Sequence, residues 1–139
     1  MQVKLVSSDK ELQKVADTML QLRSQYDRQT VIRQMQEQRK AGYQIAYVEA
    51  DGHVLCVAGF VVAVKLAWGR HIYVDDLVTD ARYRSNGAGK LLIDWLKSYG
   101  KKSRCREIHL DSGVQRFGAH RFYLREGFHI SSHHFLLQL

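Results

Sequence analysis

The sequence predicts a mixed α/β fold in which helices cover the faces of a twisted, mixed sheet. Three observations carry this prediction: apolar runs with strand-like patterning, amphipathic segments with helical spacing, and a strand–turn–helix–strand unit over residues 71–111 that forms a parallel crossover. The chain has 139 residues, of which 45% are hydrophobic and 25% are charged. These values are typical of one globular domain that spans residues 1–139.

The first part of the chain predicts a short strand followed by two helices. Residues 2–6 alternate in polarity, as a half-buried strand does. Ser8 stands three residues before Glu11, a capping-box pattern that starts a helix. The apolar face of that helix is made by Leu12, Val15, Met19 and Leu22. A second, more polar helix is expected from about residue 28 to residue 40, where Gly42 ends it.

The rest of the chain alternates strands and helices. The pair Asp51-Gly52 separates two strand-like runs and predicts a tight hairpin. The run after this pair is long and mostly apolar, which favours a central strand buried on both faces. Beyond it we expect a strand at 71–80, a helix at 87–101, a strand at 106–113, a short helix at 117–127 closed by Gly127, and one or two strands in 128–139. The predicted order is β-α-α-β-β-β-α-β-α-β-β.

Charge and cysteine content narrow the class of protein. The formal net charge of +7 favours an anionic partner: a nucleic acid, an acidic surface or a phosphate-bearing small molecule. Cys56 and Cys105 form no CxxC pair, which favours two reduced thiols in a cytoplasmic protein.

No apolar run approaches 18 residues and no signal-peptide pattern opens the chain, so we expect no membrane association. His129, His133 and His134 lack acidic or cysteine ligands at ordered spacing, so no metal site is expected.

The segment RYRSNGAGKLL, residues 82–92, leads from the expected strand at 71–80 into the expected helix at 87–101. Gly87 and Gly89 lack β-carbons and permit unusual dihedral angles, and the unpaired N–H groups of a helix start attract phosphate oxygens. Glycine spacing alone leaves two interpretations open, a plain tight turn and a pyrophosphate site. The segment matches neither the GxxxxGK[ST] loop nor the GxGxxG fingerprint.

Two linked motifs decide between these interpretations. RSNGAG, residues 84–89, matches [QR]-x-x-G-x-[GA], and AHRFYLREGF, residues 119–128, matches A-x-x-F-Y-x-x-x-G-F. One helix and one strand separate them, and together with the element order they resemble the GNAT superfamily of acetyl-CoA-dependent N-acetyltransferases over nearly the whole chain. The resemblance implies the GNAT fold, in which the fourth and fifth strands splay apart. It also implies direct transfer of an acetyl group from acetyl-CoA to a primary amine through a tetrahedral intermediate.

The resemblance further implies which residues bind acetyl-CoA. Backbone N–H groups of the glycine turn would contact the pyrophosphate, and the strand before the turn would pair with the pantetheine amides. The implied acetyl-CoA-binding residues are Leu77, Val78, Thr79, Arg84, Ser85, Asn86, Gly87, Ala88, Gly89, Lys90, Arg116 and Ala119. Arg116 departs from the family, which often has asparagine at this position, and Ser112 or Gln115 are alternatives for that contact.

The resemblance places Tyr123 at the family's general-acid position. A phenol has an ordinary pKa near ~10, so it keeps its proton at neutral pH and can donate it to the leaving thiolate. Asp75 and Asp76 are the first candidates for the base that accepts the proton of the amine. Adjacent strand residues point to opposite faces, so one of the two is expected to face the amine. Asp111 and His109 are further candidates, and a water relay would need no dedicated base.

The expected partners are acetyl-CoA and an amine acceptor, either a small molecule or a protein amine. The main alternative is a non-catalytic regulatory module that binds acetyl-CoA without turnover. The basic residues are scattered and do not alternate with aromatic residues on one strand, which argues against a nucleic-acid-binding domain. Many members of the family pair through C-terminal strands, so the last residues make a homodimer an expectation.

Overall fold

The computed structural model describes residues 1–139, which form two compact units, residues 1–109 and 110–139. The first unit contains a five-stranded sheet with the order β1-β2-β3-β4-β5. Its strands are β1 (Gln2–Leu5), β2 (Gln44–Ala50), β3 (His53–Lys65), β4 (Gly69–Thr79) and β5 (Glu107–Leu110), of which β5 ends at the first residue of the second unit. The strands β1 to β4 are successively antiparallel. The predicted mixed α/β class is confirmed.

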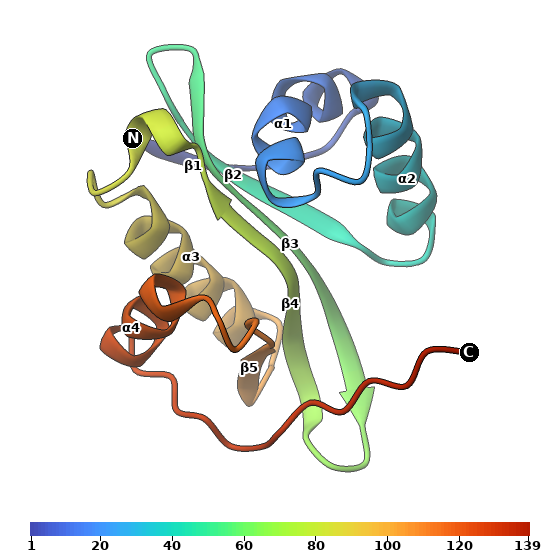
Figure 1. The fold of residues 1–139 in the computed structure, drawn as a ribbon, viewed down its shortest axis with the longest axis vertical. Coiled ribbons are helices and arrows are strands. Elements are labelled where there is room, and N and C mark those ends of the chain that lie inside the picture. The colour runs from blue at the N-terminus through green and yellow to red at the C-terminus, as the bar shows by residue number, and fades with distance from the viewer. The chain divides into compact units, whose positions relative to one another are not determined.

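Three helices of the first unit cover the sheet. α1 (Asp9–Leu22) and α2 (Arg28–Lys40) lie on one face, and α3 (Ala88–Lys102) lies on the other (Figure 1). The core between the sheet and the first two helices includes Leu12, Val15, Met19, Val31, Met35, Ile45, Tyr47 and Val57. A single-turn 3-10 helix, η1 (Ala81–Tyr83), follows β4, and α4 (Phe117–Arg125) belongs to the second unit. No helix has both the length and the apolar character that crossing a bilayer requires.

Local signals explain where the helices begin. The Ser8 hydroxyl accepts a hydrogen bond from the Glu11 N–H, and the Glu11 carboxylate accepts one from the Ser7 N–H, so the predicted start of α1 is confirmed. A full capping box formed by Asp27 and Thr30 starts α2.

Three of the four α-helices end in the same structural motif. α2, α3 and α4 all end in a Schellman motif, whose residue past the cap adopts a positive φ: Gly42 at 102°, Arg104 at 62° and Gly127 at 97°. The predicted helix-ending roles of Gly42 and Gly127 are therefore confirmed, whereas Arg104 adopts this conformation without being glycine.

The strand predictions are confirmed for the hairpin and the central strand. Asp51 and Gly52 have φ values of 51° and 77°, as the two-residue type I′ turn requires. The residues from Leu55 to Phe60 in β3 are buried, and Cys56 is fully buried among them.

The prediction of one or two strands in residues 128–139 is wrong, because α4 is the last regular element. Ile130, Phe135 and Leu137 expose 75%, 91% and 86% of their surface. A strand is stabilised by hydrogen bonds to a neighbouring strand, and this segment has no strand partner. Its apolar pattern alone does not form the strand.

Candidate active site

The two aspartates predicted as base candidates lie at an irregularity in β4. The register of β3 and β4 pairs Gly59 with Asp76 and Phe60 with Val74, so Asp75 is the extra residue of a β-bulge. A bulge bends its strand and redirects the side chains next to it. Asp75 is exposed here, whereas the Asp76 side chain exposes only 12% of its surface.

Both oxygens of the Asp76 carboxylate accept hydrogen bonds. Arg23, the C-cap residue of α1, donates from Nε to Oδ1 at 2.7 Å, and the Tyr43 hydroxyl donates to Oδ2 at 2.5 Å. Burial, followed by the charge of Asp76, raises the pKa of Tyr43 well above its ordinary value. The Tyr43 hydroxyl therefore remains a hydrogen-bond donor. The positive charge of the Arg23 guanidinium lies against the Asp76 carboxylate and compensates it.

Gly59 makes room for the Tyr43 ring. A β-carbon at Gly59 would overlap the Tyr43 hydroxyl, so a larger residue at this position in β3 would displace the phenol. Glycine inside a strand commonly marks such a close approach. Three separate elements, the end of α1, the residue before β2 and the middle of β3, thus combine to hold Asp76.

Asp75 is in a different environment. Its main-chain carbonyl accepts a hydrogen bond from Arg23 Nη2 at 2.9 Å, but its carboxyl group faces solvent. Surrounding protein atoms raise the pKa of Asp75 and the charge of Asp76 raises it further, while Arg23 opposes both effects. An exposed carboxylate with a raised pKa is a stronger proton acceptor than an ordinary one.

The end of β4 presents an edge of the sheet. Residues 77–79 are half-buried and pair with β3 on one side only. β5 has four residues against the eleven of β4, and the Arg106 N–H just before β5 donates to the Arg70 carbonyl near the start of β4 at 2.8 Å. A strand this short that begins beside Arg70 ends before it reaches residues 77–79. The outward backbone groups of this edge can therefore pair with an added amide chain.

The loop after β4 is fixed by a buried carboxylate. Asp80 is 2% exposed, and it accepts hydrogen bonds from the Arg82 N–H and from the Arg82 guanidinium at 2.9–3.1 Å. These contacts lower the pKa of Asp80 to about 2, although burial opposes them. The Ala81 N–H donates to the Gln21 side chain at 2.9 Å, which ties the loop to α1.

The N-terminus of α3 is open. Its N-cap residue Gly87 has a φ of 87° and provides no side-chain cap, and Ser85 also adopts a positive φ of 66°. The first helical hydrogen bond runs from the Leu91 N–H to the Gly87 carbonyl at 3.0 Å, so the N–H groups of the first turn have no acceptor within the helix. Among them, the Ala88 N–H donates a long hydrogen bond of 3.4 Å to Asn86 Oδ1. A β-carbon on Gly87 would come no closer than 4.0 Å to another atom, so φ rather than crowding requires glycine.

This open turn is suited to an anion. Helix N-termini carry partial positive charge and direct N–H groups outward. Arg84 and Asn86 are exposed beside it, and Ala88 and Gly89 open the helix. Lys90 adds a further cation whose ammonium lies 2.9 Å from the Asp94 carboxylate one turn along.

The second motif encodes the end of α4. The Phe128 N–H donates to the Tyr123 carbonyl at 3.0 Å and the Gly127 N–H donates to the Leu124 carbonyl at 3.2 Å, the two bonds of a Schellman motif. The Phe128 ring packs against the Tyr123 ring, with 5.7 Å between centroids. The spacing Y-x-x-x-G-F therefore fixes Tyr123, which is 9% exposed, by the local geometry of a helix terminus.

Arg116, where the sequence departs from the family pattern, lies at the start of α4. Arg116 is the exposed N-cap residue and provides no side-chain cap, while Ala119 is half-buried in the first turn. Just upstream, the Ser112 hydroxyl is buried without a hydrogen-bond partner. Buried polar groups are normally paired, so this hydroxyl is available to a bound amide.

The two further base candidates are engaged elsewhere. The Asp111 carboxylate lies 3.3 Å from His134 Nδ1. His109 stacks on Trp68 with 3.5 Å between ring centroids, and its Nε2 lies 3.1 Å from the Glu107 carboxylate. Asp111 is exposed like Asp75, but its carboxylate lies beside a histidine.

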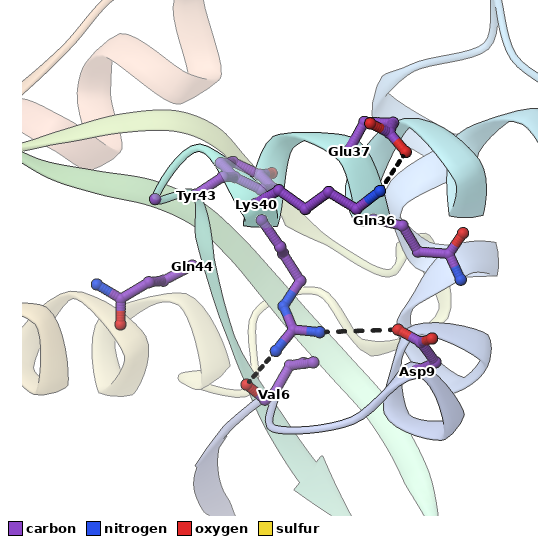
Figure 2. A pocket seen from close by; sticks show the side chains of 9 residues that line it. Val6, Asp9, Gln36, Glu37, Lys40, Tyr43 and Gln44 are labelled. Atoms are coloured by element: carbon purple, nitrogen blue, oxygen red, sulfur yellow. Dashed lines mark hydrogen bonds and ion pairs between the residues drawn. The ribbon is translucent and has the colours of Figure 1, made fainter.

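A cavity of about 730 Å³ lies at the C-terminal end of α2 and contains none of the predicted site residues. Its charged side chains are arranged in pairs: Lys40 contacts Glu37 at 2.9 Å (Figure 2), and Arg39 lies 3.9 Å from Asp9. The charges of this cavity therefore compensate one another. Tyr43, which also lines it, connects it to Asp76.

Sequence reasoning identified one part of this arrangement and missed another. The first unit brings together Asp75, Asp76, the edge at 77–79 and the turn at 84–90, whereas Arg116, Ala119 and Tyr123 belong to the second unit. Arg23 and Tyr43 were not predicted. A signal for the close approach of Tyr43 existed in Gly59, a glycine inside an otherwise apolar strand, whereas no sequence signal indicated Arg23.

Comparisons with known proteins show the family of this chain. The model of the acetyltransferase (GNAT) family matches residues 11–128. A curated Bacillus subtilis (strain 168) protein, described as the uncharacterized N-acetyltransferase YhdJ, is 31% identical over 135 residues, covering 96% of this chain and 95% of that protein.

Two solved structures have the same fold. The aminoglycoside N-acetyltransferase AAC(6')-Iy in complex with CoA has a TM-score of 0.87 at 15% identity, covering 99% of this chain and 93% of that one. The ribosomal-protein-alanine N-acetyltransferase of Brucella melitensis biovar Abortus 2308 has a TM-score of 0.86 at 13% identity and covers all of both chains. The chain is an acyltransferase enzyme that belongs to the GNAT family of acetyltransferases.

Proposed function

We propose that the protein transfers the acetyl group of acetyl-CoA directly to a primary amine. The observation that carries this proposal is the open N-terminus of α3 at Gly87, which follows the one-sided edge of β4 after the short helix η1. A pyrophosphate and an amide-containing arm are the chemical groups that such a pair of features accommodates.

The donor is held mainly by backbone groups. The N–H groups from Arg84 to Gly89 receive the pyrophosphate, with the side chains of Ser85, Asn86, Ala88 and Lys90 around it. Leu77, Val78 and Thr79 pair with the pantetheine amides as a neighbouring strand would. The family resemblance adds Arg116 and Ala119 of the second unit to the residues assigned to the arm. The Ser112 hydroxyl, which has no hydrogen-bond partner, is our candidate for the contact of the amide side chain that the family often has at position 116.

Asp75 is the residue that we assign to the amine. An amine attacks only when neutral, so an ammonium must first lose a proton, and Asp75 accepts it. The exposure of Asp75 and its raised pKa support this choice, and the two hydrogen bonds on Asp76 argue against the alternative.

The neutral amine then forms a C–N bond to the thioester carbonyl carbon, and the C–S bond breaks as the tetrahedral intermediate collapses. The nitrogen releases its second proton to solvent. Tyr123 gives its phenolic proton to the sulfur, so that CoA leaves as a thiol, and is reprotonated from water. The acceptor is an amine of a small molecule or of a protein.

A thiol-release assay with acetyl-CoA and a panel of amines tests the proposal. We expect thermal stabilisation by acetyl-CoA and thiol release that requires an amine. Stabilisation without turnover on any amine would instead support a regulatory acetyl-CoA-binding module. Tyr123→Phe is expected to lower kcat by roughly 10²-fold while leaving the Kd for CoA nearly unchanged. A large loss of CoA binding in this variant would contradict the acid role.

A further inference from the structure

We propose that Arg23 and Tyr43 are positioning residues for the acetyl transfer: they fix Asp76 and the bulge of β4 so that Asp75 faces the acceptor amine. This inference rests on the proposed function, in which Asp75 accepts the proton of the amine.

Arg23 makes two contacts across the bulge. Its Nε donates to the Asp76 carboxylate at 2.7 Å and its Nη2 donates to the Asp75 carbonyl at 2.9 Å. One guanidinium thus holds the side chain of one bulge residue and the main chain of the other. The planar guanidinium makes the two contacts from two nitrogens in a fixed fork, whereas an ammonium offers only one nitrogen on a flexible stem.

Tyr43 holds the opposite oxygen of Asp76. Its hydroxyl approaches over Gly59, the residue paired with Asp76 in the sheet, and donates to Oδ2 at 2.5 Å. The carboxylate is therefore fixed from the α1 end on one side and from the start of β2 on the other. Rotation of Asp76 would break at least one of these bonds.

Desolvation by the surrounding protein raises the pKa of Asp75, and the charges at the bulge modify this effect. The charged groups that act on it are the Asp76 carboxylate, which raises its pKa, and the Arg23 guanidinium, which lowers it. The Tyr43 phenol stays protonated and contributes no charge. Removing Arg23 and removing the charge of Asp76 should consequently change the pKa of Asp75 in opposite directions.

Arg23→Gln and Asp76→Asn test this prediction. The acid limb of the pH profile of kcat/KM is expected to move to higher pH in Arg23→Gln and to lower pH in Asp76→Asn. Arg23→Lys keeps the charge and should restore the position of this limb, although kcat stays roughly tenfold or more below wild type because the double contact is lost. The KM for acetyl-CoA should change little in all three variants.

Matched controls separate positioning from general damage. Tyr43→Phe should lower kcat, whereas Tyr47→Phe, which removes a buried tyrosine–carboxylate bond to Glu11 elsewhere in the same helix–sheet core, should not. Arg39→Gln removes a guanidinium that also lies near a carboxylate and a main-chain carbonyl, and it should leave both kcat and the pH profile unchanged. Equal losses in the variants and their controls, with no movement of the acid limb, would mean a structural role only and would overturn the inference.

A readout without turnover distinguishes failure of this inference from failure of the proposed function. In carboxyl-¹³C NMR, with the Asp75 resonance assigned by Asp75→Asn, the titration of Asp75 should move upward in Arg23→Gln and downward in Asp76→Asn. Unchanged titration would refute the positioning role even in an active enzyme. If the titration moves as expected but no amine is acetylated by the wild-type protein, the contact network stands and the proposed reaction is wrong.

Discussion

Asp75 and Asp76 are neighbours with the same side chain, yet their surroundings give them different properties. The Asp76 side chain is 12% exposed and doubly hydrogen-bonded, whereas Asp75 is exposed and has a raised pKa. Asp75→Asn is expected to lower kcat/KM by roughly 10²-fold, because an amide cannot accept the proton of the amine. Initial rates with acetyl-CoA and the best acceptor measure this loss.

The pH dependence has a definite sign. A base works in its ionised form, so wild-type activity should fall as pH drops through the raised pKa of Asp75, which lies above the ordinary aspartate value of 3.8. Asp75→Asn should lack this limb. The control Asp17→Asn, which removes an exposed carboxylate paired with Arg28, should keep both the rate and the limb. A full rate in Asp75→Asn would exclude Asp75 as the base.

At the scale of the elements, the strand–turn–helix segment at Gly87 is the part most sensitive to added bulk. Gly87→Ala places a β-carbon beside the open N–H groups at a φ that disfavours it, so the Kd for CoA should rise roughly tenfold, or by about 1.4 kcal/mol. Gly52→Ala imposes similar strain in the β2–β3 hairpin, at a φ of 77°. It should lower stability without changing the Kd, as titration calorimetry with CoA would measure. Equal Kd values in the two variants would mean that the glycine turn does not bind CoA.

The ends of the helices give a second prediction at this scale. Arg104 occupies the left-handed position of the Schellman motif of α3, where a β-carbon costs about 1 kcal/mol. Arg104→Gly should therefore raise the free energy of unfolding by up to this amount, and Gly42→Ala at the end of α2 should lower it by a similar amount. Urea denaturation of both variants measures the difference. Destabilisation by Arg104→Gly would show that the arginine side chain contributes more than its backbone strain costs.

Local sequence signals predicted the elements best. The Ser8 cap, the Asp51-Gly52 turn and the glycine that ends α4 each depend on a few adjacent residues, and all three are confirmed. The contacts of Arg23 depend on a register shift in β4 and on a residue over fifty positions away in the sequence. The periodicity of apolar residues predicts neither of these features. The prediction of strands in residues 128–139 was wrong for a related reason: a strand requires a neighbouring strand, which can lie far away in the sequence.

At the scale of the whole molecule, the last eleven residues are the feature that the fold leaves unexplained. They contain large apolar side chains that are almost fully exposed, among them Phe135 at 91% and Leu137 at 86%. Exposed apolar segments with strand patterning tend to pair with another chain. We propose that two copies associate through this segment, where each copy provides the hydrogen-bonding partner that the other lacks.

Light scattering after size exclusion tests this association. The full chain is expected to elute as a dimer, and a chain that ends at Phe128 is expected to elute as a monomer. Ending there keeps the Schellman motif that fixes Tyr123, so the Kd for CoA should be unchanged by the truncation. Phe135→Asp in the full chain supplies a control without deletion: a buried charge at a dimer contact is costly, so this variant should also be monomeric. A monomeric wild-type protein at tens of micromolar would leave the apolar segment without this role, whereas a dimer that persists in both variants would place the interface elsewhere on the chain.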